Sequence, residues 1–242
     1  MEDRLRGLVK QLPSNIIAKE LVDVFFSEAN WYFGVLERHY FDKLHNAWYA
    51  VSDVMLPKGG FGNILRDLQY FPALLFQVLA VALQYLPPNT ASAKALHLED
   101  PAVCDRLSQE YSRLGMDIMA LLGRHNSSLT AVQQDLMRAL WLKNCSRGTE
   151  SWYSLGDAIR EALSPVSIRS ALTFAFRQAQ DLGLHLQCSV HQEAADDVGD
   201  TLTRLWYDEY KRRLWVTLFI WDRSVSPNVL SFQLLIQSVI WL

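Results

Sequence analysis

The residues with the most suggestive chemistry are three aspartates in the segment Asp196-Asp197-Val198-Gly199-Asp200. They fit the DDxxD spacing with which some enzymes hold magnesium against a diphosphate, because carboxylates three and four residues apart on a helix can share one hard cation. The segment lies just before a predicted helix, however, where capping and the helix dipole also favour aspartates. No second acidic metal motif follows downstream. We interpret the aspartates as residues of a helix start and keep a magnesium-dependent, isoprenoid-type helical enzyme as an alternative.

A second cluster, His185, Cys188 and His191, has a three-residue spacing that would bring its members to one metal ion from a helical face. No fourth ligand follows closely, so we interpret these as ordinary polar residues at a helix end and in a loop. The cysteines at 104, 145 and 188 are an odd number without a Cys-x-x-Cys spacing, which favours reduced, buried thiols of an intracellular protein. The GxSxG, HExxH, Walker and dinucleotide-binding glycine patterns are absent from the sequence. The sequence therefore predicts no catalytic, metal-binding or cofactor-binding residue and no enzyme.

The densest basic run is Lys-Arg-Arg at 211–213. Glu209 lies three and four residues before its two arginines, so ion pairs within a helix are expected. Asp222 and Arg223 close the apolar segment that follows, where a charge is normally paired. We interpret these charges as structural pairs, and a regulatory polar network that senses a ligand or partner is the alternative.

The chain that positions these residues has 242 amino acids, of which 50% are hydrophobic, and its formal net charge is −3. This length is sufficient for one large domain with its own hydrophobic core. The near-neutral balance argues against nucleic-acid binding by the chain alone, because such binding needs a dense positive face.

Hydrophobic residues recur at helical spacing through almost the whole sequence, and runs of alternating β-branched residues are absent. We predict an all-α, irregular multi-helix domain. One helix begins after Pro13-Ser14, one has Pro72 in its first turn and ends near Leu86, and one runs from an Asp100-Pro101 cap to Leu122 with Gly123 as its C-cap. Further helices are predicted from a Thr130 N-cap to about 147, over 151–162, and over about 201–223, the last with one apolar stripe of Leu205, Leu214, Leu218 and Trp221.

Two apolar runs, 71–83 and 229–242, are the only segments that suggest a membrane span. Both are shorter than the roughly 20 residues needed to cross a bilayer, and both contain glutamine. The first is predicted to be a buried core helix. The N-terminus has no apolar region typical of a signal peptide, so we expect no membrane partner.

The second half of the sequence carries a series of motifs in a fixed order. They occupy 141–144 (Trp-Leu-Lys-Asn), 147–152 (Arg-Gly-Thr-Glu-Ser-Trp), 155–160 (Leu-Gly-Asp-Ala-Ile-Arg), 178–185 (Gln-Ala-Gln-Asp-Leu-Gly-Leu-His), 209–215 (Glu-Tyr-Lys-Arg-Arg-Leu-Trp) and 218–223 (Leu-Phe-Ile-Trp-Asp-Arg). This order resembles the fungal-specific transcription factor domain, the helical middle region of fungal zinc-cluster and zinc-finger regulators. The resemblance marks eleven residues as structural or regulatory: Trp152, Gly156, Arg160, Gly183, His185, Glu209, Arg212, Arg213, Trp215, Asp222 and Arg223.

The resemblance implies a nuclear, non-catalytic domain that regulates transcription by RNA polymerase II. In such proteins a separate N-terminal module holds zinc and binds DNA, so we expect no cofactor in this chain and DNA contact only through a module that it lacks. The implied partners are a second copy of the chain or other transcription-factor subunits, and a small-molecule inducer. A free-standing dimerisation or inhibitor module is a further alternative.

Two segments depart from the family pattern. Residues 161–177 intervene where the family helix normally continues, and Pro165 interrupts that helix. After Arg223 the family usually reaches a Gly-Arg-Pro turn, whereas residues 224–242 form an apolar tail. Because Val-Ser recurs at 166–167 and 225–226 and can be encoded by a 5′ splice site, we hypothesise that both segments are translated introns. We accordingly expect a partial domain over 1–223 that is incomplete at its C-terminal end.

Overall fold

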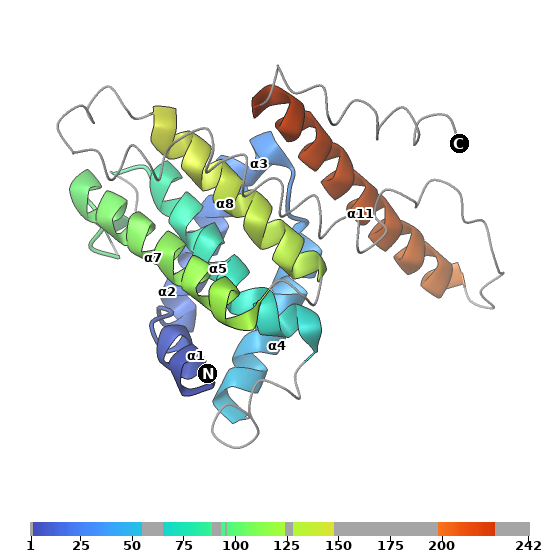
Figure 1. Cartoon of the computed structure of the whole chain (residues 1–242), viewed down its shortest axis with the longest axis horizontal. Helices are drawn as coiled ribbons and strands as arrows, with labels where there is room; N and C mark the ends of the chain where they lie inside the picture. The colour runs from blue at the N-terminus through green and yellow to red at the C-terminus, as the bar shows by residue number, and fades with distance from the viewer. Residues whose placement is uncertain are drawn as a thin grey trace.

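The computed structural model describes residues 2–54, 65–88, 93–94, 96–123, 128–147 and 198–225. Within these ranges the chain is helical, without a strand, and the predicted all-α fold is confirmed. In chain order the elements are α1 (Glu2–Val9), α2 (Asn15–Val24), the π-helical segment η1 (Phe25–Ala29), α3 (Asn30–Phe33), α4 (Arg38–Val54), α5 (Arg66–Tyr85), α7 (Pro101–Leu122), α8 (Leu129–Arg147) and α11 (Val198–Val225). Figure 1 shows α11 lying along one side of the bundle that the other helices form.

Helix α5 is the centre of the hydrophobic core. Every residue from 70 to 83 is buried, and the helix packs against α2, η1, α4, α7 and α8. It is the one helix of the described ranges that is long and apolar enough to cross a membrane, but most of its apolar window is buried inside the protein. The prediction of a buried core helix is therefore confirmed.

The predicted start of this helix was wrong. Pro72 is not in the first turn, because α5 begins at Arg66 and the proline is its seventh residue. An interior proline lacks the N–H that would bond to the carbonyl of the residue four positions earlier, and the cost is about 3 kcal/mol. Burial of Leu68, Tyr70 and Phe71 against neighbouring helices offsets that cost, so tertiary packing outweighs the local preference.

Helix caps in the structure agree with one prediction and correct another. The Ala102 N–H donates to the Asp100 side chain at 2.9 Å, as expected for the N-cap of α7. For α8, the predicted cap Thr130 was wrong. The Ala131 N–H donates to Ser128 Oγ at 3.1 Å, so Ser128 is the N-cap and the helix begins two residues earlier than predicted. Thr130 is freed for another contact, since its hydroxyl donates to Asp67 of α5 at 3.3 Å.

Several polar side chains between α5, α7 and α8 are joined by hydrogen bonds. Gln77 Nε2 donates to the Ser112 carbonyl at 2.9 Å, and the indole N–H of Trp141 donates to Ser108 Oγ at 2.8 Å. Ser108 in turn donates to the Ala80 carbonyl at 2.7 Å. Because buried polar groups are costly without partners, these bonds specify how the three helices align.

Helix α11 spans 198–225, slightly longer than predicted, and its buried face differs from the predicted stripe. Leu214 is 1% exposed, whereas Leu205 is 57% exposed. Nine residues separate these two leucines, which is two and a half helical turns and places them on opposite faces. The side chains of Leu218 and Trp221 lie outside the described part of the structure. The face that packs against the other helices is instead formed around Tyr207, Tyr210 and Leu214.

Candidate functional site

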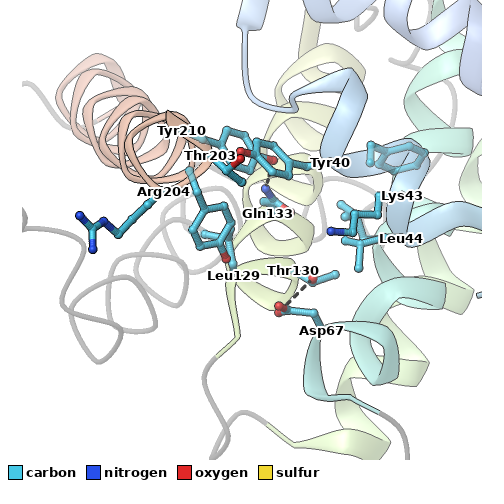
Figure 2. Close-up of a pocket in the computed structure, with 13 residues that line it drawn as sticks. Tyr40, Lys43, Leu44, Asp67, Leu129, Thr130, Gln133, Thr203, Arg204 and Tyr210 are labelled. Carbon is cyan, nitrogen blue, oxygen red and sulfur yellow. Dashed lines mark hydrogen bonds between the residues drawn. The ribbon is translucent and has the colours of Figure 1, made fainter. Parts of the chain in front are cut away.

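A cavity of about 510 Å³ lies where α4, α5, α8 and α11 meet (Figure 2). Its size is in the range of small-molecule sites, which are concave and mostly apolar with a few convergent polar groups. Its walls combine aromatic and aliphatic side chains with charged and hydroxyl groups: Tyr40, Phe41, Lys43, Leu44, Asp67, Leu74, Leu129, Thr130, Gln133, Thr203, Arg204, Tyr207 and Tyr210.

Three tyrosines form the wall at the junction of α4 and α11. The rings of Tyr40 and Tyr210 are stacked, with centroids 5.1 Å apart and planes 15° apart. Tyr207 meets Tyr40 edge to face, with a centroid separation of 5.5 Å. The Lys211 ammonium lies 4.7 Å from the centre of the Tyr207 ring, within the range of a cation–π contact. These ring contacts hold α11 against α4.

Tyr210 is the most deeply buried of the three tyrosines, at 5% exposure. Its hydroxyl accepts a hydrogen bond from Gln133 Nε2 of α8, which ties α11 to a second helix. Burial raises the pKa of Tyr210 above its ordinary value, only partly offset by its hydrogen bonds to the Glu37 backbone and to Gln133, so the phenol stays neutral. Burial also raises the pKa of Tyr207, and the nearby carboxylate of Asp67 adds to that effect.

Opposite charges occupy another part of the wall. Lys43 reaches towards the cavity from α4, and Asp67 lies on α5 with one carboxylate oxygen held by Thr130 (Figure 2). Lys43 makes no ion pair with any residue that the structure describes. Arg204, by contrast, points away from the cavity. The side chains that face the interior therefore present one positive and one negative charge beside an aromatic wall.

An ion pair connects α11 to the segment before α4. Arg213 contacts Glu37 at 2.9 Å across 176 residues of sequence. The pairs predicted within the helix are observed, because Glu209 contacts Arg212 at 2.7 Å and Arg213 at 3.9 Å. The Arg212 hydrogen bond lowers the pKa of Glu209. The contact with Glu37 was not predicted, since no local sequence signal relates residues so far apart.

Only some of the residues that the sequence motifs singled out lie within the described ranges. Trp215 packs against the core in α11, and Asp222 and Arg223 belong to the same helix, although their side chains are not described. Several residues lie outside the described ranges, as do the segment 161–177 and the tail from 226 onwards: Trp152, Gly156, Arg160, Gly183, His185, Cys188, His191, Asp196 and Asp197. Their structural or regulatory role therefore stays a prediction.

The metal hypotheses gain no support within the described part of the chain. Residues 198–200 of the aspartate motif form the first turn of α11, so the motif runs into a helix start. Among the described residues, no group of three or more His, Cys, Asp or Glu side chains is arranged to hold a metal ion.

The residues that line the cavity were missed by the motif search. Tyr40 and Lys43 are three residues apart on α4, but Asp67 of α5 and Gln133 of α8 are far from them in sequence, and no motif links the three helices. The one local sign of a site is that each of these four side chains is polar or amphipathic and lies on a helix with many buried residues. The arrangement of the four helices alone brings them together.

Comparison with known proteins gives one match. The family model described as fungal specific transcription factor domain matches residues 22–229. No curated protein and no solved structure matches the chain. The matched span includes α4, α5, α8 and α11, and hence the whole cavity wall.

Proposed function

The chain belongs to the family of fungal-specific transcription factor domains, and on this premise we propose that it is the regulatory helical domain of a nuclear regulator of RNA polymerase II transcription. The family is non-enzymatic, which does not favour the magnesium-dependent enzyme considered from the aspartate motif. In this proposal a separate zinc module, outside these 242 residues, contacts DNA. The partners of the helical domain are a second copy of the chain or other transcription-factor subunits.

The observation that supports a regulatory role is the way α11 closes the cavity. Thr203, Tyr207 and Tyr210 of α11 form one wall, and the remaining walls belong to α4, α5 and α8. A ligand that touches both sides binds the docked arrangement better than the undocked one, and so shifts the population of the two. Docking of α11 is thus the step through which a signal would reach an attached activation region.

A reporter assay tests this function directly. The chain is placed between a heterologous DNA-binding module and an activation domain in fungal cells, and reporter output is compared at equal protein level. Tyr210→Ala removes the stacked ring and the Gln133 contact, and we expect it to change output at least severalfold. Arg113→Ala, at an exposed ion pair on α7, is the control and should leave output unchanged. Equal output from the parent and the Tyr210 variant would contradict a regulatory role for α11 docking.

A further inference from the structure

We propose that the cavity binds a small zwitterion that carries an aromatic ring, which is the chemistry of an aromatic α-amino acid. This inference deepens the proposed function by naming the class of its effector. The biological role of the ligand rests on that function, whereas binding itself does not.

The aromatic part of the ligand follows from the cavity's size and its apolar walls. A volume of about 510 Å³ accommodates a single ring with a short side chain. Tyr207 offers a ring for edge-to-face or offset contact, and Leu44 and Leu129 supply aliphatic surface around it. A ligand without a ring leaves this surface uncovered, so it binds more weakly.

The zwitterionic part follows from the two charged side chains. Lys43 carries a positive charge without an ion-pair partner among the described residues, and it reaches towards the cavity (Figure 2). Asp67 carries a negative charge, and Thr130 orients it by binding one of its two carboxylate oxygens at 3.3 Å. A ligand carboxylate meets Lys43 and a ligand ammonium meets the second oxygen of Asp67, each through a charge-assisted hydrogen bond.

The same two charges explain selectivity. A ligand with only a carboxylate is attracted by Lys43 but repelled by Asp67, and a ligand with only an ammonium meets the reverse. Either one also leaves one side chain of the pair without a ligand partner. Because Lys43 is largely exposed, we expect each missing ligand charge to weaken binding about fivefold.

Calorimetric titration of the full chain tests the inference with four probes. They are L-phenylalanine, 3-phenylpropionate without the ammonium, phenethylamine without the carboxylate, and L-alanine without the ring. We expect saturable binding of L-phenylalanine and at least fivefold weaker binding of the other three. Binding should also slow amide hydrogen exchange in α11, because the bound form requires the docked helix.

Charge-deleting variants assign the site. Lys43→Met should lower affinity for L-phenylalanine about fivefold. It should not lower affinity for phenethylamine, and should raise it, because that probe has no carboxylate and its ammonium is repelled by Lys43. Asp67→Asn should show the converse pattern with 3-phenylpropionate. Lys94→Met, which removes an exposed lysine away from the cavity, is the matched control and should bind as the parent does. Circular dichroism verifies that each variant folds, and Lys43→Gln provides a second variant that removes the same positive charge.

Three results would overturn the inference. The first is no saturable heat with L-phenylalanine up to the millimolar range. The second is equal affinity for L-phenylalanine and either singly charged probe, which refutes the zwitterion. The third is parent-like binding by Lys43→Met and Lys43→Gln, which places any binding elsewhere. A chain that binds as expected but whose Tyr210 variant leaves the reporter unchanged would refute the regulatory function and keep the ligand assignment.

Discussion

Tyr210→Phe tests how α11 is held against the rest of the protein. The substitution keeps the ring that stacks on Tyr40 and removes only the hydroxyl, which accepts from Gln133 and also bonds to the Glu37 backbone. Gln133 is 2% exposed, so its side-chain donor loses a partner where water does not easily replace it. An unsatisfied buried group costs about 1–3 kcal/mol. We expect the variant to lower the free energy of α11 opening by about that amount.

Amide hydrogen exchange measures this quantity helix by helix. A loss of about 1–3 kcal/mol corresponds to exchange roughly 5- to 150-fold faster in α11. Exchange in α5 should change much less, because the central helix is buried by several neighbours that the substitution does not touch. Urea unfolding of the same variant provides the global stability for comparison.

Two further variants separate the hydrogen bond from other effects. Tyr40→Phe changes the other ring of the stack, and its hydroxyl makes no hydrogen bond to any residue that the structure describes, so it should alter stability by less than about 0.5 kcal/mol. Combining Tyr210→Phe with Gln133→Leu removes both partners of the Gln133 bond and should recover the part of the loss that comes from the unpaired Gln133 side chain. The reasoning is refuted if α11 exchange in Tyr210→Phe stays within about twofold of the parent, or if Tyr40→Phe has an equal effect.

Three other predictions follow from the core. Gly115→Ala places a Cβ 3.0 Å from the Ala73 carbonyl oxygen, so the urea midpoint should fall by the equivalent of about 1–3 kcal/mol. Gly7→Ala, whose Cβ would have nothing within 4 Å, is the control and should stabilise the chain slightly. Equal midpoints for the two variants would contradict the close contact at Gly115. Burial raises the pKa of Cys145 to about 12, so at pH 8 iodoacetamide should alkylate this thiol on the order of a thousandfold more slowly in the folded than in the unfolded chain. Peptide mass spectrometry measures the two rates, and similar rates would refute the burial of Cys145. Burial lowers the pKa of His45, so the unfolded chain binds the proton more readily and stability should decline as pH falls below about 6.5. His45→Gln should make the urea midpoint depend less on pH between pH 6.5 and 5. An unchanged pH dependence would exclude this histidine as the cause.

Local features of the sequence were sufficient where the interactions are local. Asp100 followed by Pro101 marks a helix start because both preferences act within one turn, and the structure has that cap. Glu209 and its two arginines pair because a helix brings residues three and four apart onto one face. The helical class itself follows from the apolar spacing that recurs along much of the chain.

Predictions failed where contacts with segments distant in sequence outweigh a residue's local preference. Thr130 has the chemistry of an N-cap, but Ser128 takes that position and Thr130 bonds to Asp67 on another helix. Pro72 suits a first turn, yet burial of the preceding residues extends α5 through it. Both outcomes depend on packing partners that are distant in sequence.

The amino-acid order was thus enough to establish a helical chain, several of its helix ends, the ion pairs of Glu209 within α11 and the family motifs. The cavity, the Glu37–Arg213 pair and the stack of Tyr40 on Tyr210 required the tertiary structure. The physical reason is the range of the interactions. Capping and helical pairing act over three or four residues, whereas burial is non-directional and joins whichever faces the packed helices bring together. The cavity takes its lining from four helices that are far apart in sequence, so the spacing within any one helix does not reveal the site.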